Sequence, residues 1–160
     1  MYEPGSLQVE QSRFLVDKPE VTEEEIASFL AERAKKTGSR KSSHDAVTEM
    51  TTPHIASPDV HVDNHGKKII MYFHGLESVG TQLSRVAISN DGLSFQAEPQ
   101  ILGKSYMRIF KYGGYTYALT MPGAICRSVD GFNDFAVGPT LFNPDMRHST
   151  VLLRGDTLWV

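Results

Sequence analysis

Two arginines and three histidines stand close to predicted strands, where their side chains could bind or act on a polar ligand. Arg108 and Arg147 could clamp an anionic group, because a guanidinium is planar and offers paired N–H donors. The alternative is that they form structural ion pairs between neighbouring sheets. His148 could donate to a ligand oxygen or act as an acid or a base, and His54 and His74 also flank predicted inner strands. The alternative for these histidines is a buried structural role.

A second group of polar residues raises the question of a metal site. The segment 61–65 (His-Val-Asp-Asn-His) places two imidazoles and a carboxylate close together, which are good ligands for transition metals. The neighbouring Gly66 marks a turn, however, and polar residues near a hairpin tip are typical of a solvated surface. Cys126 lies between Ile125 and Arg127 in a predicted strand and is expected in the core. No Gly-rich phosphate loop, nucleophile elbow or metalloprotease helix is present, so we expect neither a metal nor a cofactor.

The composition narrows the class of protein further. The chain has 160 residues, of which 40% are hydrophobic and 22% charged, and a formal net charge of −3. A single cysteine excludes a disulfide within the chain and a cysteine-based zinc site. No apolar run is long enough for a transmembrane helix, and a pI near 6.0 gives no reason to expect nucleic-acid binding.

One helix is predicted, at about residues 23–36. Thr22 and Glu25 form a capping box, and Gly38 follows the last turn as a C-terminal stop. An apolar stripe at helical spacing is expected to pack on the main body. Its members are Ile26, Phe29, Leu30 and Ala34.

From residue 53 onward the pattern predicts short strands in a repeating arrangement. The Ser-x-Asp-Gly-x-x-Phe segment 89–95 is echoed by residues 128–135, with the two Asp-Gly pairs 39 positions apart. Arg108 and Arg147 are also 39 positions apart. A period near 40 residues with four short strands is typical of a β-propeller blade.

The repeat predicts an all-β fold, namely a partial propeller of about two and a half blades with one inserted helix. We expect blades at residues 53–102 and 103–143 and an incomplete one at 144–160. Residues 1–52 would hold the end of a preceding blade and the helical insertion. The alternative is a small antiparallel sandwich with a helix.

Several segments resemble a known family. Residues 54–63 (His-Ile-Ala-Ser-Pro-Asp-Val-His-Val-Asp), followed by Gly66 and by residues 71–75 (Met-Tyr-Phe-His-Gly), are similar to the blade-opening pattern of five-bladed β-propeller glycoside hydrolases. This is the clan around glycoside hydrolase families 43 and 32. Residues 105–110, 125–131 and 146–149 look like a little-characterised branch of these proteins.

The resemblance implies a carbohydrate site in a central funnel, lined by the first strand of each blade. Carried over by position, the funnel residues are Ser57 and Asp59 from one blade, Tyr106 and Arg108 from the next, and Arg147 and His148 from the third. Such a polar cluster suits sugar hydroxyls or a sugar carboxylate.

The catalytic set that the resemblance implies is incomplete. Inverting glycosidases need two carboxyl groups about 6.5–9.5 Å apart. Arg147-His148 stands where a middle blade of the family could supply an Asp that tunes the acid. Asp59 matches a recurrent family position and, with His148, is a candidate catalytic residue. The alternative for Asp59 is an Asx-type turn after Pro58.

We therefore expect a carbohydrate-active propeller that cleaves a glycosidic bond in its full-length form. The alternatives are a non-catalytic carbohydrate-binding or scaffold propeller and, more weakly, a sialidase-like protein, since the Asp-Gly turns partly match the Asp box of that class. The chain is expected to be a fragment that self-associates through exposed sheet edges, with a carbohydrate but neither nucleic acid nor a membrane as its partner. The N-terminus has no signal-peptide pattern. The cellular location of the protein is therefore left undecided, with the cytoplasm as the default expectation.

Overall fold

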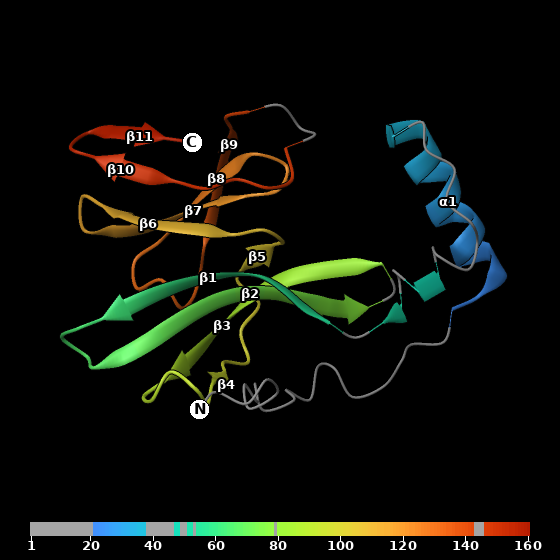
Figure 1. Cartoon of the computed structure of the whole chain (residues 1–160). Helices are drawn as coiled ribbons and strands as arrows, with labels where there is room; N and C mark the ends of the chain where they lie inside the picture. Colours follow the sequence, from blue (N-terminus) through green and yellow to red (C-terminus); the bar gives the residue numbers. More distant parts are fainter. Residues whose placement is uncertain (1–20, 38–46, 49–50, 53, 79, 143–145) are drawn as a thin grey trace.

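Strands dominate the part of the chain that the computed structural model describes, which comprises residues 21–37, 47–48, 51–52, 54–78, 80–142 and 146–160. Every pairing among these strands is antiparallel. The prediction of a mostly β fold is therefore confirmed (Figure 1). The blade end expected in residues 1–10 lies outside the described residues.

The first sheet is a meander in which successive strands lie side by side. Its strands are β1 (Ile55–Asp63), β2 (Lys68–Ser78), β3 (Thr81–Ser89) and β4 (Gln96–Ala97), in that order, with β5 (Gly103–Lys104) paired to β3. The pairing of β1 with β2 is interrupted by a bulge between Ala56 and Asp59. Since β5 belongs to this sheet, the sheet extends slightly beyond residue 102, where the repeat predicts that the blade ends.

The second sheet repeats the same order and a hairpin follows it. Its strands are β6 (Arg108–Tyr112), β7 (Tyr115–Thr120), β8 (Ala124–Ser128) and β9 (Ala136–Thr140). The hairpin consists of β10 (Leu152–Arg154) and β11 (Thr157–Trp159). In Figure 1 the hairpin lies next to β6, on the side away from the first sheet.

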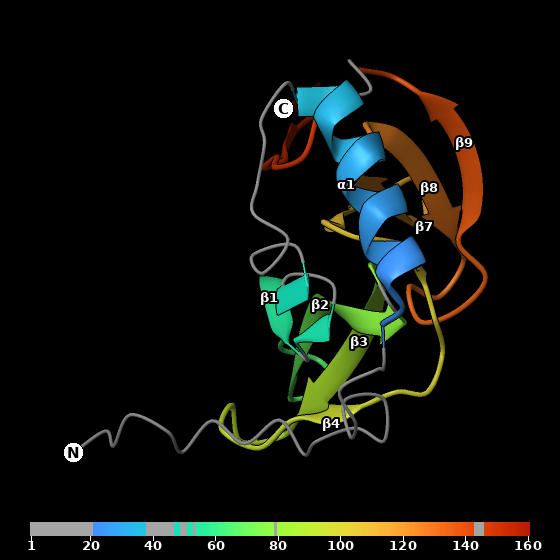
Figure 2. The ribbon, with the colours of Figure 1, turned by 90° about the vertical axis from the view of Figure 1, so that its right-hand side faces the viewer.

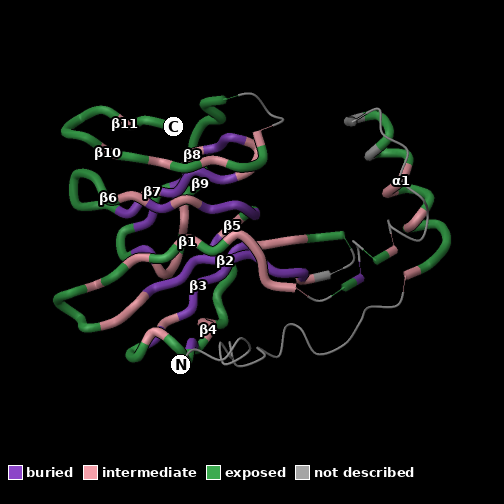
Figure 3. The backbone as a smooth tube through the Cα atoms, viewed as in Figure 1, coloured by how far each residue is buried: buried purple, intermediate pink, exposed green. Residues whose placement is uncertain are grey.

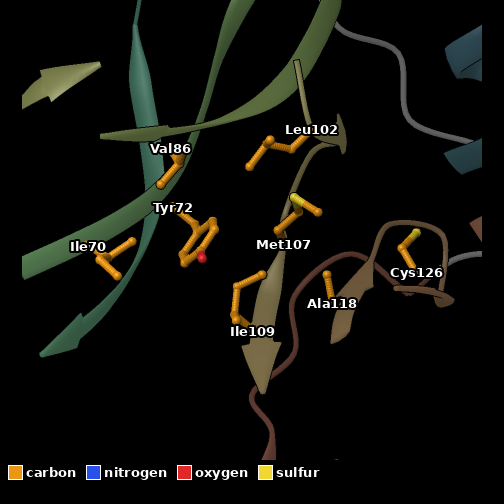
Figure 4. Close-up of a cluster of buried hydrophobic side chains, with 8 residues drawn as sticks. All are labelled: Ile70, Tyr72, Val86, Leu102, Met107, Ile109, Ala118 and Cys126. Carbon is orange, nitrogen blue, oxygen red and sulfur yellow. The ribbon is translucent and has the colours of Figure 1, made fainter. Parts of the chain in front are cut away.

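The first and second sheets enclose a common hydrophobic core. Figure 3 shows the buried segments concentrated in the middle strands of both sheets. Tyr72 also joins the sheets through its hydroxyl, which donates to the Gly131 carbonyl oxygen at 3.1 Å. Cys126 is buried there, as its position in the sequence predicts. The full inter-sheet core (Figure 4) consists of Ile70, Tyr72, Val86, Leu102, Met107, Ile109, Ala118 and Cys126.

The repeated Ser-x-Asp-Gly segment forms the turn between the third and fourth strand of each sheet. In the first sheet, Ser89 Oγ accepts from Gly92 N at 2.8 Å, and Asp91 Oδ1 accepts from the backbone N–H groups of residues 93 and 94. In the second sheet, the corresponding serine and aspartate bind residues 131, 132 and 133 in the same way. The repeat in the sequence is thus a repeat in turn structure.

The helix expected at about 23–36 is α1 (Glu23–Thr37), and its capping box is formed. Thr22 N donates to Glu25 Oε2 at 2.8 Å, and Glu25 N donates to Thr22 Oγ1 at 3.2 Å. The expected packing of its apolar stripe on the sheets is wrong. The stripe residues are half-buried or exposed, and α1 stands apart from the sheets in Figure 1 and lies in front of them in the turned view of Figure 2.

Candidate functional site

The first strands of the two sheets and of the hairpin supply equivalent positions to one region. Their hairpins close at the pairs Asp63–Lys68, Tyr112–Tyr115 and Arg154–Thr157. Counting back six residues from the first member of each pair gives Ser57, Tyr106 and His148. All three are among the residues that the sequence places in the site. By the same count, the position equivalent to Arg108 is Asp59 in the first sheet and Thr150 in the hairpin. Arg108 and Arg147 are therefore not equivalent, although they lie 39 residues apart in the sequence.

Two of these positions have an unusual backbone. Ser57 has φ of 51° and Tyr106 has φ of 63°, in the left-handed region that residues with a side chain rarely adopt. Each costs roughly 1–2 kcal/mol, and such strain clusters at ligand-binding and catalytic sites. The left-handed conformation thus recurs at matching places, in the bulge of β1 and two residues before β6.

Tyr106 is the centre of an aromatic cluster. Its side chain is only 6% exposed, and its ring centroid lies 4.5 Å from those of both His74 and His148. The phenol oxygen accepts a hydrogen bond from Arg147 Nε at 2.8 Å. The contact of Tyr106 with substrate stays a prediction; the structure shows that this buried side chain binds Arg147 and packs against His148.

His74 is a buried histidine that stays neutral. It lies on β2 opposite Ala56, and its Nδ1 accepts from Tyr106 N at 3.4 Å, which leaves the proton of the neutral ring on Nε2. Burial lowers the pKa of His74 to about 4, and the positive charges of His54, Arg108, Arg147 and His148 add to this effect. At neutral pH His74 is therefore a neutral hydrogen-bond donor that lies near the guanidinium charges of Arg108 and Arg147.

His54 approaches the same cluster from the segment before β1. Its ring centroid is 6.4 Å from that of His74. Its Nδ1 lies 2.7 Å from the Thr52 carbonyl oxygen, to which it donates, and its Nε2 accepts from the Gln82 amide at 3.1 Å. These two contacts fix the orientation of the ring. His74 and His148 thus contact Tyr106, and His54 contacts His74.

Asp59 joins the first strands of the two sheets. Its Oδ2 accepts from Ile109 N in β6 at 2.7 Å, and His61 Nε2 lies 3.1 Å from the same oxygen. Burial raises the pKa of Asp59, but the His61 contact, the Ile109 bond and the charge of Arg108 together leave it below its usual value. The carboxylate bonds to a strand 50 residues away, which differs from the Asx-type turn after Pro58 that the sequence left as the alternative.

Arg108 also ties segments together instead of forming an ion pair. Its Nε donates to the Ser149 carbonyl oxygen at 2.9 Å, and its Nη1 donates to the carbonyl oxygens of Ser57 and Met107 at 3.1 and 2.9 Å. One guanidinium thereby holds β1, β6 and the segment before β10 at a common point. Neither the anion clamp nor the inter-sheet ion pair describes this arrangement.

Arg147 and His148 are the exposed members of the cluster. Arg147 Nε is held by Tyr106, and no hydrogen bond joins the two Nη groups of the guanidinium to another described residue. Within the described part of the chain, Arg147 has no carboxylate partner. The site therefore offers donors and positive charge at its surface, on a base of buried aromatic rings.

The remaining expectations concern metals and membranes. Among the described residues, no group of three metal-ligating side chains occurs, and His61 of the segment 61–65 contacts Asp59. No described helix combines the length and apolarity that a membrane-crossing helix requires.

A comparison with curated proteins finds a similar viral protein. It is a protein of Acanthamoeba polyphaga mimivirus described as uncharacterized protein R118, and it is 30% identical to this chain over 128 residues. The similarity covers 69% of this chain and 36% of the viral protein, so the chain spans about a third of that relative's length. No protein-family model and no solved structure matches the chain.

Proposed function

We propose that the chain is part of a carbohydrate-active β-propeller of the glycoside hydrolase type, and that its described residues hold the sugar. The observation that carries this proposal is the meeting of equivalent positions from successive sheets: the rings of Tyr106 and His148 touch at a 4.5 Å centroid distance. In a propeller, the first strands of all blades face one axis, so equivalent residues gather around one ligand.

The order of the strands supports the propeller. Two meanders of four antiparallel strands are followed by a hairpin, and the same turn recurs in both meanders. The mimivirus relative extends beyond the similar region, which leaves room in that protein for further sheets. A sandwich would not require the first strands of successive sheets to converge in this way.

The chemistry of the described residues favours binding over cleavage. Glycosidic hydrolysis needs two carboxyl groups beside the scissile bond, one of them with a raised pKa. Asp59 has a lowered pKa and is bonded to Ile109 N, so it suits neither role well. Hydrolysis by a full-length protein would depend on carboxylates outside the described residues.

Affinity electrophoresis tests the proposed function. The whole chain is run through gels that contain arabinan, xylan, levan or polygalacturonate, alongside the variants His148→Ala and His65→Ala. His65 is an exposed histidine in the β1–β2 turn and serves as the matched control. We expect at least one polysaccharide to retard the wild type and the control but not His148→Ala. Equal mobility in all gels, or equal retardation of both variants, would contradict the proposal.

A further inference from the structure

Arg147 differs from Arg85 of β3 in how its positive charge is compensated. Arg85 is buried and paired with Glu77 at 2.6 Å, so its charge is neutralised within the first sheet. Arg147 is exposed and has no such partner among the described residues. A guanidinium that is oriented but not neutralised by the protein can bind an anionic group of a ligand.

The orientation of Arg147 is built into the structure. Tyr106 accepts from Nε and is itself fixed between two imidazole rings, so the guanidinium plane is held, and no described residue binds its Nη groups. A guanidinium in a fixed plane can bind a carboxylate through two parallel hydrogen bonds. His148 follows directly in the chain and can add a third donor.

The surroundings favour a negative charge over a neutral group. The guanidinium charges of Arg108 and Arg147 both lie close enough to His74 to lower its pKa, so two permanent positive charges stand near each other in the site. The carboxylate of Asp59 is turned toward Ile109 and His61. A carboxylate on a ligand would reduce this repulsion, whereas a hydroxymethyl group would not.

We infer that the site is specific for a sugar that carries a carboxylate, a hexuronic acid, with the carboxylate on the Arg147 guanidinium and His148 as a neighbouring donor. The inference rests on the proposed function, which requires only that a sugar binds. It adds the class of sugar and the residue that selects it.

The test compares D-glucuronate with D-glucose, which differ in the carboxylate at C6, by NMR titration of the whole chain. A charge-assisted bidentate contact should make glucuronate bind roughly tenfold more tightly than glucose. In Arg147→Gln the two sugars should bind within about twofold of each other, and Arg147→Lys should keep part of the preference. Arg154→Gln removes the same charge from the exposed hairpin turn and should leave the preference unchanged.

Each outcome separates the inference from the proposed function. Equal binding of both sugars, or an unchanged preference in Arg147→Gln, would overturn the carboxylate inference and leave a sugar site standing. Acetate that displaces glucuronate at equal concentration would also overturn it, because the sugar ring would then contribute nothing. Failure of both sugars to bind, together with unretarded migration in every polysaccharide gel, would overturn both proposals.

Discussion

Tyr106 is the residue on which the geometry of the candidate site depends. It adopts a strained backbone conformation, its ring fills the space between His74 and His148, and its hydroxyl fixes Arg147. A strained conformation persists only where surrounding contacts favour it. The contacts of this one side chain therefore link the core of the protein to the exposed donors.

Removal of the Tyr106 hydroxyl should lower the stability of the fold modestly and should disturb the orientation of Arg147 more strongly. Tyr106→Phe keeps the ring contacts but leaves Arg147 Nε without its acceptor, and the expected loss of stability is about 1 kcal/mol. Tyr112→Phe is the control, because it removes an exposed hydroxyl that donates to Asp156 and should cost less. Urea unfolding measures both variants, and an equal loss in the two would contradict the positioning role of Tyr106.

Asp59 provides a second prediction at this scale. Asp59→Ala leaves the N–H of Ile109 without a partner in the seam between β1 and β6, which should cost about 1–3 kcal/mol in urea unfolding. Asp59→Asn keeps an oxygen acceptor and should lose less. If the two variants unfold at the same urea concentration as the wild type, the carboxylate does not tie the sheets.

The sequence predicts which residues surround the site better than it predicts what they do. Ser57, Tyr106 and His148 follow from the family resemblance, which places them near the start of the first strand of each blade. The partners of Asp59 and Arg108 do not, because the Asp59–Ile109 bond spans 50 residues and Arg108 binds backbone carbonyls. Local patterns carry no information on such long-range backbone contacts.

At the scale of elements, the two Ser-x-Asp-Gly turns are the best-predicted features of the fold. Their aspartates accept hydrogen bonds from the next backbone N–H groups, and Gly92 and Gly131 adopt φ of 78° and 84°, which residues with a side chain rarely reach. All of these contacts are local, so the sequence is sufficient to predict them. The position of α1 was not predictable, because an apolar stripe does not specify which surface a helix meets.

The aspartates of the two turns should make the free energy of unfolding depend on pH in the acidic range. Hydrogen bonds from Ser94 and Leu93 lower the pKa of Asp91 to about 2, and those from Asn133 and Phe132 lower the pKa of Asp130 to about 2, from 3.8 for both. A lowered pKa in the folded state stabilises the fold above 3.8, and this stabilisation is lost as the pH falls through 2.

The double variant Asp91→Asn/Asp130→Asn tests this dependence. It should be less stable than the wild type at pH 6, and the difference should shrink as the pH falls from 4 toward 2. Unfolding midpoints in urea at pH 6, 4, 3 and 2 measure the effect. A difference that stays constant over this range would show that the turns do not depend on ionised aspartates.

The core between the sheets gives another prediction for the elements. Val86 is fully buried in β3, whereas Val137 in β9 is 76% exposed. Val86→Ala should cost about 2 kcal/mol through lost packing, and Val137→Ala should change stability by less than about 0.5 kcal/mol. Thermal or urea unfolding compares them, and similar effects at both positions would argue against a shared core at β3.

At the scale of the whole molecule, exposed strands and side chains favour association. The edge strand β9 is exposed along its whole length, and large apolar side chains including Val137 and Trp159 lie open to solvent. Unpaired edges of this kind readily pair with another chain. Neighbouring blades of a larger propeller would cover the same surfaces.

Light scattering should therefore show a mass that rises with protein concentration. Val137→Lys places a charge on the β9 edge and should reduce the association. Val129→Lys places the same charge on an exposed residue of the β8–β9 turn and should reduce it less. A monomeric mass at all protein concentrations would contradict the expectation that these surfaces associate.

The most direct test of the sugar site is to map where a sugar binds. In a ¹H–¹⁵N titration of the whole chain with D-glucuronate, we predict that the largest amide shifts occur at Tyr106, Arg147 and His148, with smaller ones at Ser57 and His74. These residues come from distant parts of the sequence and meet only in the folded site. Shifts confined to the turns at Asp91 and Asp130, or spread evenly over the chain, would contradict the account.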